Sequence, residues 1–158
     1  MAMYMRLEEQ VDADFGRARR RAVLRRLAAR LRGVAAPGGA KNCFGEVRKR
    51  VCAVGGLQLG LRAVRSTDIV GSVGRCREFD GAFLPASGNV RARWETVDRA
   101  FHQGRELPPV SLYKLGGYYF VLDGNHRVSV ARYYGVEWID AEVTEFRPIR
   151  RESMDANA

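Results

Sequence analysis

The sequence predicts an α+β fold, in which a small mixed β-sheet with packed helices is preceded by a basic N-terminal helix. After that first helix the expected elements follow in the order helix, strand, helix, hairpin, helix and strand, unlike the regular alternation of an α/β protein. Two apolar runs flank Gly116-Gly117, a pattern typical of a β-hairpin. The chain has 158 residues, 46% of them hydrophobic, which suffices for one domain with a buried core.

The first predicted element is a basic helix over Phe15 to Arg32, because Ala, Leu and Arg favour helices and the apolar residues recur at helical spacing. Gly33 is expected to end this helix, and residues 35–39 have the Pro- and Gly-rich composition of a linker. The sequence therefore predicts three parts: a basic helical extension with its linker over 1–39, a main domain over 40–148, and a loose polar tail over 149–158.

The middle of the chain carries shorter patterns. Apolar residues at helical spacing predict a short helix from Phe44 that ends at Gly55-Gly56, and alternating leucines predict a strand over Leu57 to Leu61. Residues 65–74 resemble a turn. Asn89 is expected to cap a second helix, whose buried stripe comprises Val90, Trp94, Val97 and Phe101.

The last third has the clearest pattern. A strand is predicted from Pro109 to Leu115 and a returning strand over Tyr118 to Leu122, which is nearly all apolar and is therefore expected inside the sheet. Asp123-Gly124 breaks this run. A helix over Asn125 to Tyr134 and a final strand over Val136 to Val143 complete the predicted domain. The aromatic residues expected in the core are Trp94, Phe101, Tyr118 and Phe120.

The charge balance favours polyanionic partners. Lys plus Arg number 27 against 18 Asp plus Glu, a net charge of +9, so nucleic acid, nucleotides or an anionic surface are expected ligands, beside the alternative of a basic protein without such a partner. The arginine-rich helix could contact nucleic-acid phosphates, lie on an anionic membrane or simply pack with solvated arginines, and its small apolar residues disfavour the membrane. The candidate nucleic-acid contacts are Arg17, Arg19, Arg20, Arg21, Arg25 and Arg26.

The cysteines and the N-terminus predict a cytoplasmic protein. Cys43, Cys52 and Cys76 are widely spaced and odd in number, which argues against a disulfide scaffold and favours a reducing compartment. Met1 to Gln10 contains no apolar stretch typical of a signal peptide, and no apolar run approaches the roughly 20 residues of a membrane helix. We expect no membrane partner, while a homodimer is compatible with the sequence.

The informative motif is a strand followed by Asp123-Gly124-Asn125-His126-Arg127 and then a helix. A glycine at such a turn allows a phosphate to approach the unpaired N–H groups and the positive dipole of the helix N-terminus. Arg127 can add a two-pronged contact and His126 a hydrogen bond, while Asp123 could hold Mg²⁺ through water or accept a proton. The alternative is an ordinary turn with a capped helix and a surface arginine.

This motif and its surroundings resemble the ParB/sulfiredoxin superfamily. The resemblance rests on residues 106–112, a Pro-apolar-x-Val strand, and on 119–132, a hairpin strand leading into a Gly-x-x-Arg turn and a helix. Upstream, residues 68–70 and 75–80 resemble the family's first box, where an arginine precedes a Phe-Asp pair. Together these stretches extend from about residue 57 to 146.

The resemblance implies a nucleotide pocket that takes ATP, ADP or CTP, and Asp123 could add Mg²⁺ as an accompanying ion. The phosphate contacts that it implies or that the motif predicts are Gly124, Asn125, His126, Arg127, Arg75 and Arg77. Asn125 stands where sulfiredoxin has its reactive cysteine, so sulfinic-acid reduction is not expected. The chain ends soon after the last strand, so a full partition protein, with its helix-turn-helix and dimerisation domains, is not expected either.

Two classes of function remain open from the sequence. The first is a nucleotide hydrolase or phosphotransferase, with Asp123 and Glu78 as candidate catalytic carboxylates. The second is a regulatory module in which bound nucleotide changes how the arginine-rich helix meets DNA or RNA. A nuclease is a third and weaker alternative, and fold analogy alone does not choose among them.

Overall fold

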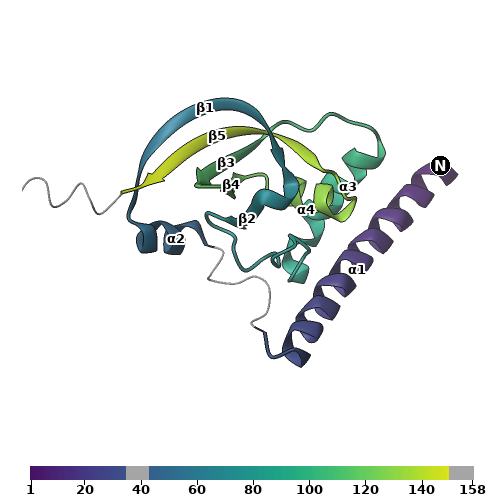
Figure 1. Ribbon diagram of the computed structural model, residues 1–158. Coiled ribbons are helices and arrows are strands. Elements are labelled where there is room, and N and C mark those ends of the chain that lie inside the picture. The colour runs from purple at the N-terminus through teal and green to yellow at the C-terminus, as the bar shows by residue number, and fades with distance from the viewer. Residues whose placement is uncertain (35–42, 150–158) are drawn as a thin grey trace, which may run out of the picture.

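The computed structural model describes residues 1–34 and 43–149 and confirms the α+β class. A five-stranded mixed sheet lies between helices, with one long helix along its outer side (Figure 1). The α-helices are α1 (Ala2–Leu31), α2 (Phe44–Val51), α3 (Arg91–His102) and α4 (Asn125–Tyr133). The strands are β1 (Ala53–Arg65), β2 (Ile69–Ser72), β3 (Val110–Leu115), β4 (Tyr118–Asp123) and β5 (Trp138–Pro148).

The strand order is β1-β5-β3-β4-β2. The β1–β5 and β3–β4 pairs are antiparallel, whereas the β3–β5 and β2–β4 pairs are parallel. Strand β4 therefore lies inside the sheet, as its apolar sequence predicts. It delivers Asp123 to the end of the sheet where α4 begins.

Two sequence predictions about the strands are wrong. Gly55-Gly56 does not end a helix, because both glycines lie within β1 at positive φ, 107° and 158°, where the β1–β5 register shifts. Such an irregularity is a bulge, which glycine tolerates in a strand. Residues 69–72, expected in a turn, form β2. This short strand pairs with β4, about fifty residues further along the chain, so no local pattern indicates it.

Helix α1 is longer than the predicted 15–32 and is part of the main hydrophobic core. Its buried residues are Val11, Asp14, Phe15, Ala18 and Ala22, one stripe at helical spacing. Glu8 and Asp12 form ion pairs with Arg99 and Arg91 of α3 at 2.7 Å and 2.5 Å, which extends the contact toward the N-terminus. The linker at 35–39 with its domain boundary, and the tail beyond 149, lie outside the described residues.

Each face of the sheet has its own core. Leu112, Val121 and Val143 face α3 and α4, beyond which α1 packs (Figure 1), and this cluster includes Trp94. On the other face, Phe44 of α2 contacts Phe120 and Phe146 edge-on.

Two of the expected core aromatics are instead exposed. Trp94 and Phe120 are buried as predicted, but Tyr118 is 62% exposed and Phe101 is 38% exposed. Tyr118 follows the hairpin turn, and Phe101 lies in the last turn of α3, stacked on Tyr134 with ring centroids 4.4 Å apart.

A disulfide joins Cys43 to Cys76, whereas the number and spacing of the cysteines argued against a disulfide scaffold. Cys52, the third cysteine, is not in a disulfide, and it is exposed. Since disulfides are characteristic of oxidising compartments, the predicted cytoplasmic location stays a prediction. Among the described residues, no helix has an apolar stretch of the length needed to span a bilayer.

Candidate functional site

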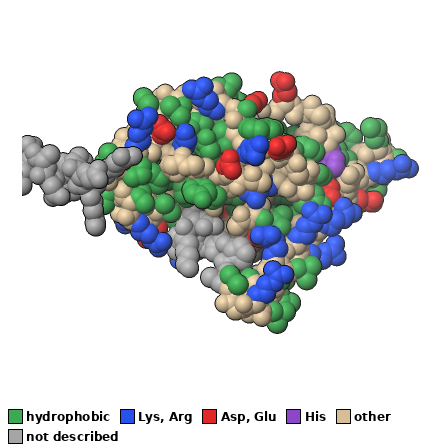
Figure 2. All heavy atoms as spheres, viewed as in Figure 1, with side chains coloured by type: hydrophobic (Ala, Val, Ile, Leu, Met, Phe, Trp, Pro, Cys, Tyr) green, Lys and Arg blue, Asp and Glu red, His purple; other side chains and the backbone are tan. Residues whose placement is uncertain are grey.

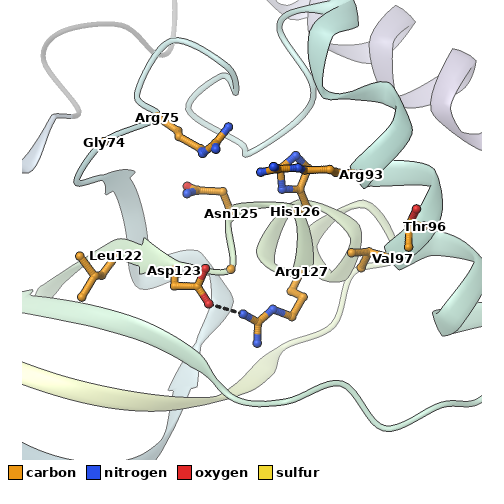
Figure 3. A pocket seen from close by; sticks show the side chains of 11 residues that line it. Gly74, Arg75, Arg93, Thr96, Val97, Leu122, Asp123, Asn125, His126 and Arg127 are labelled. Carbon is orange, nitrogen blue, oxygen red and sulfur yellow. Dashed lines mark hydrogen bonds and ion pairs between the residues drawn. The ribbon is translucent and has the colours of Figure 1, made fainter.

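The predicted phosphate motif lines a pocket of about 480 Å³, within the size range typical of ligand sites. The first turn of α4 forms one wall, the loop after β2 supplies Gly74 and Arg75, and α3 supplies Arg93, Thr96 and Val97 (Figure 3). The sequence motif and a concave surface therefore coincide.

Gly124 sets the geometry of the turn. Its φ of +103° is a left-handed conformation that side chains rarely adopt, and a Cβ added here would lie 2.6 Å from Val110 Cγ1. The residue is the N-cap of α4 and offers no side-chain cap. Because the first helical hydrogen bond is from Val128 N to Gly124 O, the N–H groups of residues 125–127 have no partner within the helix.

Two buried polar atoms of pocket-lining residues also lack a partner. Asn125 Oδ1 and His126 Nε2 are inaccessible to solvent and make no hydrogen bond within the described part of the chain. Asn125 is only 5% exposed. A buried polar atom without a partner costs about 1–3 kcal/mol, so such atoms are rare in folded proteins. The Asn125 oxygen is an acceptor and needs a donor, whereas the His126 nitrogen can donate to an acceptor when it is protonated.

The pocket is electropositive around His126. Burial is the largest cause that lowers the pKa of this imidazole, followed by the charge of Arg75. Glu78 opposes them, and Arg93 lowers the pKa by a smaller amount. The imidazole also meets the Phe79 ring edge-on at 5.5 Å. The lowered pKa favours the neutral imidazole in the free protein, beside two cationic side chains.

Arg127 is largely engaged with the protein itself. Its Nη1 donates to the carbonyls of Pro108 and Pro109 at 2.5 Å and 2.8 Å, and its Nη2 donates to Asp123 Oδ2 at 2.6 Å (Figure 3). Three of its five N–H donors are thus used, and two remain. Arg127 therefore holds the segment before β3 against α4. This structural role is additional to the phosphate contact that the sequence predicts.

The other predicted residues are divided between the pocket and its surroundings. Asp123 lines the pocket with a largely exposed carboxylate, whereas Glu78 is not among the lining residues and binds Arg75 Nη1 at 3.0 Å. Arg75 lines the pocket, but the exposed Arg77 does not. The pocket thus contains one of the two candidate catalytic carboxylates and one of the two upstream arginines.

Arg93 lines the pocket and was missed from the sequence. It enters because α3 packs across α4, where Trp94 Nε1 donates to Ser129 Oγ at 2.9 Å within the core. That contact fixes the position of α3, and the neighbouring Arg93 therefore lies at the pocket. No spacing pattern could have indicated it, since the two residues that set the position are 35 apart in the chain.

The arginines of α1 mostly contact the protein. Arg17 and Arg25 form ion pairs with Asp14 and Asp80, at 2.7 Å and 3.1 Å. Arg19 donates to the Pro85 carbonyl, and Arg21 lies over the Tyr133 ring at 4.8 Å. Of the six candidate nucleic-acid contacts, only Arg20 and Arg26 are exposed and have no such interaction with the described residues. Figure 2 shows basic side chains in separate groups with acidic ones between them.

Comparison with known proteins gives little further information. No family model matches the chain, and no curated protein has a similar sequence. Among solved structures, sulfiredoxin from Arabidopsis thaliana aligns with 61% of this chain and 93% of its own, at 14% sequence identity and a TM-score of 0.41. A likeness at this level carries no argument about function, which must come from the pocket itself.

Proposed function

We propose that this chain binds a nucleoside di- or triphosphate, such as ATP, ADP or CTP, with its phosphates on the N-terminus of α4, and that it hydrolyses the nucleotide or transfers a phosphoryl group. The observation that carries the proposal is the convergence of hydrogen-bond donors in one pocket: the N–H groups of residues 125–127, which have no partner within the helix, and beside them the imidazole of His126. Phosphate oxygens accept hydrogen bonds from such N–H groups and favour the positive end of the helix dipole.

The charges around the turn support the same ligand. Arg75 and Arg93 approach from two different elements, on the side of the pocket where His126 lies (Figure 3). Two guanidinium groups facing a helix N-terminus form a site for a multiply charged anion rather than for a neutral metabolite. The resemblance of residues 119–132 to the ParB/sulfiredoxin superfamily supports a nucleotide as the carrier of that anion.

The residues at the turn fit a magnesium ion that arrives with the nucleotide. Asp123 accepts from Arg127 through Oδ2 only, so its second carboxylate oxygen remains available. Mg²⁺ is commonly held by one or two carboxylates together with phosphate oxygens and water. In the proposed reaction Asp123 orients that ion or accepts a proton, and Glu78 acts indirectly by fixing Arg75.

The test is calorimetric titration of the full chain with ATP, ADP and CTP at pH 8 and pH 6, with phosphate release followed in parallel. We expect saturable 1:1 binding that is tighter at pH 6. Because the pKa of free His126 is lowered and a bound phosphate raises it, binding takes up a proton, and the affinity increases as the pH falls through the pKa of the bound form.

His126→Gln is the matched control for this pH effect. Protonation of the nucleotide itself acts equally on both proteins, so only the difference between them reports His126. Equal pH dependence in wild type and variant would remove the imidazole from the site. No heat of binding with any of the three nucleotides would refute the proposed function as a whole.

Nucleic-acid binding by α1 is the second candidate, favoured by Arg20 and Arg26, which are exposed and make no ion pair within residues 1–34 and 43–149. Each phosphate contact releases a counterion, so replacing both with Gln should reduce the slope of log K against log salt by about 2. Fluorescence polarisation with labelled DNA and RNA measures this slope. An unchanged slope would show that α1 does not make the contacts, and Arg17→Gln, which breaks an internal ion pair instead, serves as the comparison.

A further inference from the structure

A second polar cluster lies where α1 meets α3 and α4, separate from the phosphate pocket. Asp14 of α1 is 3% exposed and Asp98 of α3 is fully buried, and His102, also on α3, completes the cluster. Asp98 and His102 are four residues apart, so they lie on one face of α3. Two carboxylates and an imidazole seldom gather in a hydrophobic interior unless a bound charge compensates them.

The spacing of their ligand atoms suits a metal ion. His102 Nε2 is 3.1 Å from Asp14 Oδ2 and 3.7 Å from Asp98 Oδ2, and one ligand atom from each residue lies within 4.8 Å of the others. Around a tetrahedral ion with bonds of about 2.0–2.1 Å, neighbouring ligand atoms are about 3.3 Å apart. The two distances to the imidazole bracket this value.

One hydrogen-bond acceptor of the cluster has no donor. Tyr134 has a single hydroxyl proton, yet its oxygen lies 2.7 Å from Asp98 Oδ1 and 3.1 Å from Asp14 Oδ2. Asp98 Oδ2 is buried and has no hydrogen-bond partner among the described residues. This unpartnered carboxylate oxygen is directed into the cluster, on the side where His102 lies.

The charges of the cluster leave room for a further cation. Arg17 is the cationic residue paired with Asp14, at 2.7 Å, and it neutralises one of the two carboxylates. Asp98 is attracted by His102 and by the charge of the adjacent Arg99, but neither residue makes a hydrogen bond to its Oδ2. An imidazole that ligates a metal is neutral. A divalent ion satisfies the second carboxylate and the orphaned oxygen together.

We propose that Asp14, Asp98 and His102 bind a divalent transition-metal ion, which ties α1 to α3. One imidazole with two carboxylates is a donor set that suits Zn²⁺, and water completes its coordination. Because α3 also carries Arg93 and Val97 into the phosphate pocket, the ion fixes the helix that forms one wall of that pocket. The site does not depend on the proposed nucleotide function.

The test uses Co²⁺ as a spectroscopic substitute for Zn²⁺ in the full chain, with Cys52 replaced by Ser in every sample so that no free thiol competes. Titration should give the visible bands of a low-symmetry Co²⁺ site at one equivalent, and Zn²⁺ should abolish them. Asp98→Asn keeps the shape and the Tyr134 contact but removes a charged ligand, and should weaken metal binding at least ~10²-fold. Glu142→Gln, at an exposed carboxylate of β5, should leave it unchanged.

Thermal unfolding provides a readout independent of the spectrum. Zn²⁺ should raise the Tm of the parent chain and of Glu142→Gln but not that of Asp98→Asn. If His102→Gln does not fold, Asp98→Asn still decides the question, since an amide can occupy the same space. No Co²⁺ bands at micromolar protein, or equal affinity in the parent and Asp98→Asn, would overturn the proposal and leave the cluster as a hydrogen-bonded contact between helices.

Discussion

Replacing Arg75 and Arg93 together with Gln is expected to weaken nucleotide binding by ~10²–10⁴-fold. Hydrogen bonds to charged groups contribute about 1.5–3 kcal/mol each, so loss of two such contacts gives this range. The double variant also releases Glu78 from its ion pair and leaves a negative charge near the phosphates. Both arginines are exposed, so stability should change by less than about 0.5 kcal/mol for each.

Arg77→Gln is the matched control for this experiment, because Arg77 is also exposed and is two residues from Arg75 but does not line the pocket. It removes one positive charge where the double variant removes two, so a general effect of net charge would give it about half the double variant's change in binding free energy. Calorimetry on the variants measures the affinities. If Arg77→Gln causes half or more of the double variant's change, the nucleotide is held by diffuse charge and not by the pocket.

Phe15→Ala is expected to destabilise the fold by about 3–5 kcal/mol, the cost of truncating a buried aromatic side chain. Phe15 is 2% exposed, and its ring meets the Trp94 ring edge-on at 5.6 Å. The guanidinium of Arg91 lies over its other side at 4.8 Å. The substitution therefore opens a cavity between α1 and α3, and urea denaturation measures the loss.

Leu24→Ala, on the exposed side of the same helix, should cost no more than about 0.5 kcal/mol. The comparison separates packing from helix propensity, since both changes leave alanine in α1. A separable N-terminal extension makes the opposite prediction, because the domain would then tolerate Phe15→Ala as well as Leu24→Ala. Equal effects of the two substitutions would therefore show that α1 is not part of the core.

The turn between β4 and α4 could be predicted from the sequence because its determinants are local. An apolar strand, a glycine and a helix follow one another between Tyr118 and Tyr133, and the structure places them as expected. The positive φ of Gly124 and the free N–H groups beyond it result from that order alone.

The remaining parts of the site depend on contacts between distant segments. Arg93 reaches the pocket only through the packing of Trp94 on Ser129, and β2 exists only by pairing with β4. The partners of Arg127 are likewise carbonyls of residues 108 and 109, which come before the hairpin. Patterns within a short stretch of sequence carry no information about such pairings. The sequence therefore predicted the turn between β4 and α4 but not the other residues that line the pocket.

The central claim is that phosphate groups bind at the N-terminus of α4, and ¹H–¹⁵N NMR titration of the full chain with pyrophosphate tests it most directly. We predict that the backbone amides of Asn125, His126 and Arg127 shift downfield and saturate together, because these N–H groups gain a charged acceptor. The amides of Gly116 and Gly117, at the opposite end of β4, should not move. Saturable shifts elsewhere in the chain, with residues 125–127 unaffected, would contradict the account.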